Sequence, residues 1–461
     1  MELRKAVVRG SSHLFVRQGF GLGLSALYFI FVVRYVGPEA YGVFSLGFSV
    51  LAVTQQVMSL GLGVYLIRNP DIRKDLIDVS FSYTVLVSLL GLLSSPLLSQ
   101  LVVLNSQLPV GTFIPLLCIF ALLPILMLSI VPQSLLERNL AYKELARIEL
   151  TSQVIQLGVA LSLALASKGV WALIAGAWTQ QLTLLLGYWV YSRYKPKWQW
   201  SWSGITDILA YGLGYNISFW IWQIHFPLIL SLTSRYLGAE AVGIIALTAR
   251  LVEYISFPKS ITWRISIPVL ARLQKDKKTL LQAIEEGAFF QTFFTGLLLL
   301  CSGFFAPLVV PKLFGNNWSE VPLIFPFVAL GTLANATFAL HSSALYVLRL
   351  NKHVATFHLI HVGILGLSLF FWLPKQGLLG YGLAELTALS SYAVIHSLLV
   401  RSAGKVRFIL PMGWLVGLGI GLFYPWMGLV AFIPLFIWLL TPASFPTWGR
   451  LAKNLSMLRR G

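Results

Sequence analysis

The sequence has 461 residues, of which 57% are hydrophobic and 11% are charged, and its mean hydropathy is +0.79. About 25% of the residues of a soluble globular domain are charged, so this composition excludes such a domain and indicates a protein whose solvent is lipid. The formal net charge of +18 comes largely from Lys and Arg beside hydrophobic segments. This placement is typical of membrane topology and attraction to anionic headgroups, and not of nucleic-acid binding.

Hydrophobic segments recur along the whole chain, and each approaches the roughly 20 residues that a helix needs to cross a bilayer. The sequence therefore predicts an all-α polytopic membrane protein with about fourteen transmembrane helices, at 11–33, 41–67, 77–102, 109–135, 147–166, 170–191, 209–232, 241–267, 282–309, 321–347, 356–373, 378–399, 408–424 and 426–441. Of the 34 basic residues, 25 fall in alternate loops or at the two ends. Because Lys and Arg concentrate in cytoplasmic loops, we expect both termini to be cytoplasmic.

An internal repeat divides the chain. The turn from Arg34 to Gly42 and the turn from Arg235 to Gly243 match in Arg, Tyr, Gly, Glu, Ala and Gly at one fixed offset. Six predicted spans separate the two turns, and an even number gives a parallel repeat about an axis along the membrane normal. A weaker echo pairs 136–139 with 348–351. We expect an N-terminal six-helix bundle at 1–191, an interfacial linker at 192–208, a C-terminal six-helix bundle at 209–400, and two additional helices with a basic cytoplasmic tail at 401–461.

Five segments in this order resemble one protein family: "RYVGPEAYGVFSL" from Arg34, "SLGLGVYLIRN" from Ser59, "SLLERNLAYKELARIE" from Ser134, "IPVLARLQKD" from Ile267 and "LVVPKLFGNNW" from Leu308. They look like the polysaccharide-transport branch of the multidrug/oligosaccharidyl-lipid/polysaccharide (MOP) exporter superfamily. One departure is Ser59, where relatives of this kind often carry an acid.

The resemblance implies a Wzx-type flippase that turns an undecaprenyl-pyrophosphate-linked oligosaccharide across the cytoplasmic membrane of a bacterium by alternating access, for exopolysaccharide or O-antigen assembly. It implies no cofactor, a monomer, coupling to a proton or sodium gradient, and a polysaccharide polymerase and other assembly proteins as partners.

Charged and amide side chains inside predicted spans are the candidate site residues, because burying them in hydrocarbon is costly unless they face a cavity or a partner. Arg suits a pyrophosphate because its planar fork binds oxygen pairs. The candidates for substrate binding are Arg17, Arg250, Lys259, Arg264, Gln55, Gln56 and Asn216, and the candidates for ion coupling are Glu253 and Glu385.

Each candidate also has a structural interpretation. Arg17 can snorkel to headgroups, Arg250 and Glu253 can form an ion pair at i, i+3, Glu385 can hold an interhelical hydrogen bond, and the amides can join helices. His341, His353, His358 and His361 gather near the cytoplasmic ends of two predicted spans, but the spacing offers no third ligand for a metal. We expect neither a metal nor a catalytic site.

Competing functions stay open. Fourteen spans also suit a lipid II flippase, in which the last two spans make a groove for the lipid tail. A MATE-like drug or organic-cation antiporter should line its cavity with acids, whereas this sequence has two deep acids against several cations. A membrane glycosyltransferase, polymerase or ligase is the enzyme alternative, and the short outward turns count against it.

Overall fold

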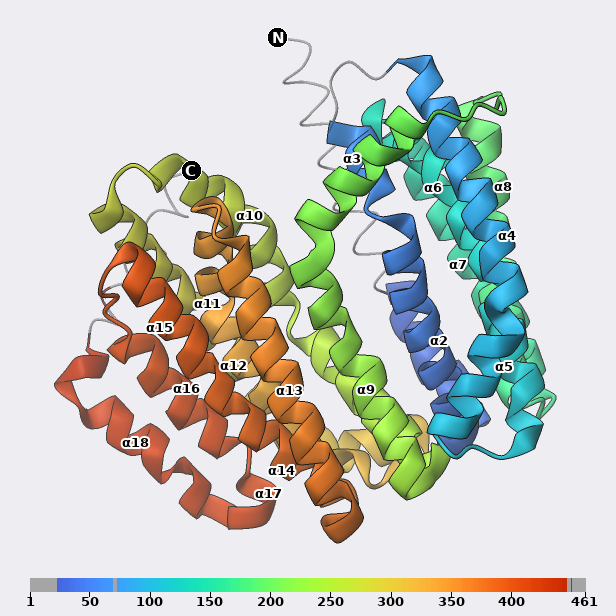
Figure 1. Cartoon of the computed structure of the whole chain (residues 1–461). Coiled ribbons are helices and arrows are strands. Elements are labelled where there is room, and N and C mark those ends of the chain that lie inside the picture. Colours follow the sequence, from blue (N-terminus) through green and yellow to red (C-terminus); the bar gives the residue numbers. More distant parts are fainter. Residues whose placement is uncertain (1–22, 69–72, 446–448, 450–461) are drawn as a thin grey trace. The chain divides into compact units, whose positions relative to one another are not determined.

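A computed structural model describes residues 23–68, 73–445 and 449, and Figure 1 shows its course. Throughout these residues the regular elements are helices, beginning with Gly23–Val36. The longer ones are α2 (Pro38–Ser59), α3 (Leu62–Arg68), α4 (Lys74–Asn105), α5 (Phe113–Phe120), α6 (Leu123–Arg138), α7 (Tyr142–Leu165), α8 (Val170–Ser192), α9 (Trp202–Ile255), α10 (Phe257–Leu273), α11 (Lys277–Phe314), α12 (Val321–Val347), α13 (Asn351–Gln376), α14 (Leu378–Ala388), α15 (Tyr392–Ala403), α16 (Ile409–Gly421), α17 (Tyr424–Met427) and α18 (Ile433–Leu440).

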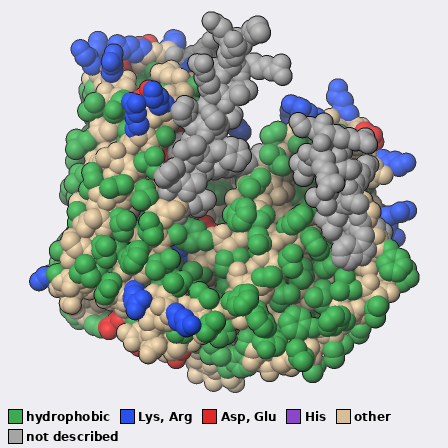
Figure 2. Space-filling model, turned by 180° about the vertical axis from the view of Figure 1, so that it is seen from behind, with side chains coloured by type: hydrophobic (Ala, Val, Ile, Leu, Met, Phe, Trp, Pro, Cys, Tyr) green, Lys and Arg blue, Asp and Glu red, His purple; other side chains and the backbone are tan. Residues whose placement is uncertain are grey.

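The chain is a multi-pass membrane protein. Ten helices of the described part are long and apolar enough to cross a membrane, and α16 with α17–α18 forms a further pair, bent by 55°. Figure 2 shows hydrophobic side chains over most of the side surface in view, as contact with lipid requires. The all-α polytopic fold is therefore confirmed, whereas the count of fourteen stays a prediction.

The last predicted span, 426–441, differs from expectation. Instead of a continuous helix over 426–441, the structure has α17, a 3₁₀ turn over Gly428–Phe432 and α18, which has only 8 residues. Gly428 takes a positive φ of 60°, where Gly is favoured, and ends α17. The segment is thus part of a broken span or a re-entrant loop.

Helix α9 has 54 residues, too long for one crossing, because at 1.5 Å per residue it would extend about 81 Å. It is divided at Gly238, whose φ of 86° and ψ of 177° are not helical. In the first copy of the repeat Gly37 takes nearly the same conformation, with φ 83° and ψ 166°. The matching turns found in the sequence therefore share one backbone geometry, in which each Gly separates two successive helices.

The two copies of this turn also pack against each other. A Cβ on Gly42 would collide with the carbonyl oxygen of Ala239, and a Cβ on Gly243 would collide with that of Pro38. Gly42 corresponds to Gly243, and Pro38 to Ala239, at the repeat offset, so the contact is reciprocal. Glycine is needed at both positions because backbone meets backbone there.

A second pair of turns with similar geometry lies further along the chain. Leu140 and Arg349 both have left-handed backbone, with φ 55° and 60°. The next helix begins two residues later in each case, at Tyr142 and at Asn351. These pairs differ by 209 positions, whereas the echo pairs Leu136 with Leu348 at 212. The echo of 136–139 in 348–351 stays a prediction.

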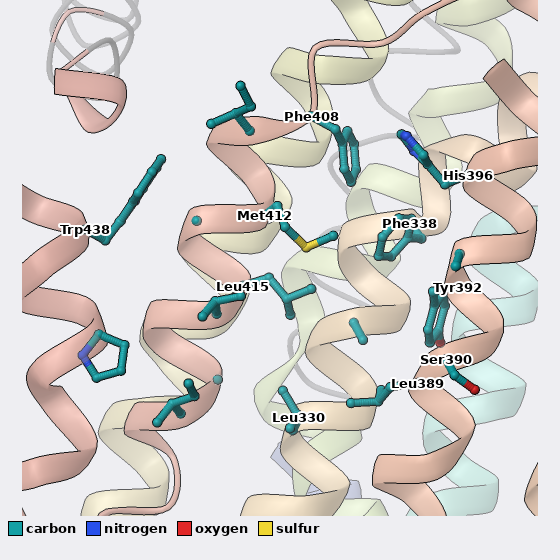
Figure 3. A pocket seen from close by; sticks show the side chains of 18 of the residues that line it. Leu330, Phe338, Leu389, Ser390, Tyr392, His396, Phe408, Met412, Leu415 and Trp438 are labelled. Atoms are coloured by element: carbon teal, nitrogen blue, oxygen red, sulfur yellow. The ribbon is translucent and has the colours of Figure 1, made fainter. Parts of the chain in front are cut away.

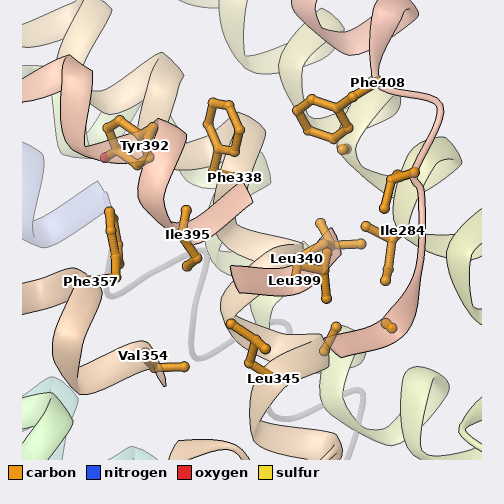
Figure 4. Packing of buried hydrophobic residues seen from close by; sticks show 14 of the residues in the cluster. Ile284, Phe338, Leu340, Leu345, Val354, Phe357, Tyr392, Ile395, Leu399 and Phe408 are labelled. Atoms are coloured by element: carbon orange, nitrogen blue, oxygen red, sulfur yellow. The ribbon is translucent and has the colours of Figure 1, made fainter. Parts of the chain in front are cut away.

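Contacts within the chain divide it into two compact units, Met1–Ile244 with Leu313–Trp318, and Ile245–Lys312 with Ser319–Gly461. The repeat-based boundaries describe halves of the sequence and stay a prediction. The second unit has a buried cluster built around Phe338, Phe357, Tyr392 and Phe408, with Ile284 among the aliphatic members (Figure 4). This cluster joins α10, α11, α12, α13, α15 and the segment that leads into α16.

The linker after α8 is fixed to the first unit. The hydroxyl of Tyr194 donates to Oδ1 of Asp78 at 2.6 Å, and the backbone N–H of Gln199 donates to Oγ of Ser82 at 2.9 Å. Asp78 and Ser82 are buried on α4. The neighbouring side chains of Trp198, Trp200 and Trp202 are exposed, which suits rings at a headgroup interface.

Candidate functional site

The eighth predicted span is broken in its middle. Helix α9 ends at Ile255 and α10 begins at Phe257, with Ser256 between them at φ −82° and ψ 24°. Pro258 lies in the first turn of α10, where its missing N–H costs nothing. Ser256 donates its N–H to Val252 at 2.9 Å and its hydroxyl to Glu253 at 3.1 Å. The break is thus hydrogen-bonded locally, and discontinuous membrane helices of this kind commonly form transporter binding sites.

Charged side chains stand on both sides of this break. Arg250 donates to Glu253 at 2.9 Å, and the two side chains are 50% and 69% exposed. The Arg250 guanidinium lies 5.2 Å from the centre of the Tyr254 ring. Lys259, half-buried at the start of α10, interacts electrostatically with Glu253.

The structure therefore contains the Arg250–Glu253 ion pair expected from the i, i+3 spacing. Because both side chains are exposed, their charges face the surroundings of the helix and not a packed interior. A charge that faces hydrocarbon costs about 2.5–3.5 kcal/mol on insertion scales, so this face requires a polar environment. The ion pair and a cavity-lining role are compatible.

Two of the predicted cations have no described side chain. Arg17 lies outside the described residues. Arg264 lies on α10, but its side chain is outside the described part of the structure. Their assignment to substrate binding stays a prediction.

The second predicted span is also broken, which the sequence analysis did not anticipate. Helix α2 ends at Ser59, and Leu60 and Gly61 follow at φ 50° and 68° before α3 begins. A Cβ on Gly61 would collide with Nδ2 of Asn216 on α9. Left-handed backbone and close approach together require Gly at this position. The second span of each sequence half is therefore interrupted.

The three predicted amide residues lie at or near this break. Asn216 is buried, and its Nδ2 donates to the carbonyl of Gly212 at 3.2 Å, so it packs α9 against the turn. Gln55 and Gln56 are half-buried on α2, within two turns of Gly61. The geometry of Asn216 fits the interhelical interpretation, and a role of the three amides in sugar binding stays a prediction.

Glu385 lies half-buried on α14 in the second unit. Its carboxylate packs on α12, because a Cβ on Gly331 would be 2.9 Å from Oε2, and Tyr381 is its hydrogen-bonding partner one turn earlier. The carboxylate thus joins two helices, as the structural interpretation expects. Ion coupling by Glu385 stays a prediction.

A large apolar groove lies between α12, α15, α16 and α18 of the second unit (Figure 3). Its volume is about 1180 Å³, above the roughly 300–1,000 Å³ of ordinary small-molecule sites. Leu330, Phe338, Leu415 and Trp438 are among the apolar residues of its wall, and Tyr392, Ser390, Ser397, Thr441 and His396 are the polar ones. The groove can hold a long hydrocarbon and offers few hydrogen bonds.

One end of this groove has a basic border. Val406 and Phe408 line the groove, whereas Lys405 and Arg407, which alternate with them along the chain, are exposed. Arg401, at the end of α15, is also exposed. The arrangement combines a hydrocarbon site with cations, which is the chemistry of an amphiphile with an anionic head.

The histidines differ from their predicted grouping. His341 contacts His396 on α15, with Nε2 and Nδ1 3.0 Å apart, while Nδ1 of His361 contacts the Ser391 hydroxyl at 2.8 Å. Among the described residues no group of three or more ligands could hold a metal. His396 lies 55 residues after His341, so only tertiary packing brings the two rings together and the sequence spacing gives no sign of the pair.

The comparison with family models decides the family. Residues 31–322 match the model of a family described as "Polysaccharide biosynthesis protein". The chain belongs to this family. The matched range includes both broken spans. A similar curated protein is the succinoglycan biosynthesis transport protein ExoT of Rhizobium meliloti (strain 1021), 21% identical over 307 residues, which are 66% of this chain and 60% of that protein.

Solved structures show the same fold at low identity. The lipid II flippase MurJ in an inward closed conformation matches with a TM-score of 0.70 and 14% identity, over 97% of this chain and 99% of that one. An inward-facing multidrug resistance MATE family transporter of the MOP superfamily matches with a TM-score of 0.63 and 14% identity, over 88% and 98%. The chain thus has the fold of these two solved structures.

Proposed function

We propose that the chain flips an undecaprenyl-pyrophosphate-linked oligosaccharide across the bacterial cytoplasmic membrane, with both termini in the cytoplasm. It acts by alternating access in polysaccharide assembly and is not an enzyme. The observation that carries the proposal is the apolar groove with its basic border. A polyprenyl tail fills the groove, and Lys405 and Arg407 attract the pyrophosphate.

The second group of cations supports the same substrate class. Arg250 and Lys259 flank the break between α9 and α10, and one acid, Glu253, lies between them. Planar guanidinium binds phosphate oxygens in pairs, so Arg250 suits a pyrophosphate when Glu253 is displaced or protonated. An organic-cation exporter would need acids in excess at such a position.

The groove is tested by filling it. Ala393 is exposed in the groove wall, so Ala393→Trp adds bulk there without removing a buried contact. We expect at least a tenfold loss of flipping of the lipid-linked oligosaccharide in proteoliposomes. Leu367→Trp, at a 75% exposed position on α13 outside the groove, is the matched control and should flip normally. Equal rates in both variants would remove the groove from the mechanism.

Coupling to an ion gradient belongs to the proposal. Glu253 and Glu385 are the candidate ion-binding acids, and Glu253 has the more exposed position. Glu253→Gln should reduce the dependence of flipping on an imposed proton or sodium gradient, while the passive rate persists. Unchanged ion dependence in this variant would assign coupling elsewhere.

A further inference from the structure

Two histidines form a hydrogen-bonded pair at the wall of the groove. His341 on α12 is fully buried, with 0% exposure, and its Nε2 lies 3.0 Å from Nδ1 of His396 on α15. His396 is half-buried and lines the groove, as Figure 3 shows for the labelled ring beside Phe408. At 1.5 Å per residue, each histidine lies about 10 Å before the end of its helix.

The surroundings of the pair are apolar and aromatic. The ring of Phe408 meets that of His341 edge-on at 4.7 Å, and Phe338 lies 5.1 Å from the same ring. The other titratable groups in and beside the surrounding cluster are Tyr392 on α15, Tyr346 on α12, and His358 and His361 on α13, whose rings contact Phe357. Nδ1 of His361 contacts the Ser391 hydroxyl, and Glu385 on α14 interacts electrostatically with Tyr392. Helix α11 contributes Leu280, Ile284 and Ala288, Phe408 directly precedes α16, and the basic groups Arg401, Lys405 and Arg407 are exposed beyond the groove end.

Two facing imidazoles have one bridging hydrogen when neutral and can share one additional proton. A second added proton is disfavoured, because two like charges would then face each other at 3.0 Å. Nδ1 of His341 is buried and has no hydrogen-bond partner among the described residues. An incompletely satisfied buried polar pair is costly to retain, which favours a function over a purely structural role.

We propose that the His341–His396 pair is a proton-binding site whose occupancy is coupled to that of the groove. A proton enters from groove water at Nε2 of His396, whose Nδ1–H then donates to Nε2 of His341, and release reverses the step. Charge at this wall is more costly against hydrocarbon than against water. A polyprenyl tail in the groove therefore expels the proton, and proton uptake releases the tail.

The coupling is reciprocal, because two ligands linked through one equilibrium change each other's affinity by the same factor. Protonation on one side of the membrane thus favours an empty groove, and loss of the proton favours a loaded one. The inference rests on the proposed function for the identity of the tail. It adds the proton site and the sign of the coupling.

The test is calorimetric titration of undecaprenol, which has no ionisable headgroup, into the full chain in zwitterionic nanodiscs. Titrations in two buffers of different ionisation enthalpy give the number of protons released per lipid bound. Across titrations at successive pH values, we expect a maximum approaching one proton. For His396→Gln and for the double replacement of His341 and His396 by Phe, we expect no proton release per undecaprenol bound, whatever the change in affinity. His353→Gln, on the first turn of α13, is the control and should match the wild type.

Three results would overturn the inference: no proton release by the wild type, release unchanged in both pair variants, or no binding of undecaprenol. The proposed function is separable from all three. Flipping of the lipid-linked oligosaccharide that persists without proton release would leave a flippase with another coupling site. Absence of flipping in the wild type and in all variants would count against the proposed flippase function.

Discussion

Gly42 and Gly243 illustrate how single residues determine the contact between the two repeat turns. Gly243→Ala forces a Cβ onto the Pro38 carbonyl, and overpacking of this kind costs about 1–3 kcal/mol. We expect a lower midpoint of thermal unfolding in detergent. Gly158→Ala on α7, where a Cβ meets nothing within 4 Å, is the control and should be neutral or stabilising, because Ala favours helix. Equal destabilisation by both changes would contradict the reciprocal packing.

The Arg250–Glu253 ion pair can have a structural role or a role in transport, and the two roles can be distinguished by mutation. Because their side chains are 50% and 69% exposed, their pairing should contribute less than about 1 kcal/mol to stability. A double-mutant cycle of Arg250→Ala and Glu253→Ala on thermal unfolding should give a small coupling energy, while Arg250→Ala lowers flipping at least tenfold. A large coupling energy with normal flipping would make the pair structural only.

Among the elements, the linker between the sequence halves depends on Asp78 and Tyr194. Tyr194→Phe leaves a buried carboxylate without its donor, a loss of about 1–3 kcal/mol, and should expose the linker to limited proteolysis in vesicles. Tyr191→Phe, at an exposed position, is the control. Unchanged cleavage would show that Gln199 and Ser82 alone hold the linker.

The pH dependence of this attachment has a defined sign. Burial, and then the hydrogen bond to Asp78, raise the pKa of Tyr194. The stability it contributes should be constant below the ordinary tyrosine pKa of about 10 and be lost as the pH rises above it. Protease sensitivity of the linker should therefore increase only in strongly alkaline buffer, and an increase near neutral pH would contradict the assignment.

The two broken helices show which elements sequence can predict. Pro258 marks the break after α9, because Pro cannot continue a helix at that point. The break at Leu60 has no proline: Leu rarely adopts positive φ, and tertiary contacts from Gly212, Asn216 and Tyr83 help to hold the turn. A hydropathy profile shows neither break, because it measures how favourable transfer to lipid is and not the backbone conformation.

Over the whole molecule, the all-helical membrane fold and the repeat at Gly37 and Gly238 were predictable. The hydrophobic composition indicates that lipid is the solvent, and a tight turn with positive φ favours glycine at a fixed position. The end of the chain was not, because 426–441 is apolar enough for a span yet breaks at Gly428. The groove and the His341–His396 pair could not be predicted from the sequence either, because they depend on packing between helices that are distant in sequence.

The central claim is that the chain moves a lipid-linked saccharide. The direct measurement is the rate at which a fluorescent undecaprenyl-pyrophosphate oligosaccharide moves between the two leaflets of proteoliposomes, read from its accessibility to a quencher outside. Lipid II and an organic cation are the competing substrates. We expect rapid flipping of the oligosaccharide lipid, slowed at least tenfold by Arg250→Ala and partly restored by Arg250→Lys. A rate equal to that of protein-free liposomes, or transport of the organic cation alone, would contradict it.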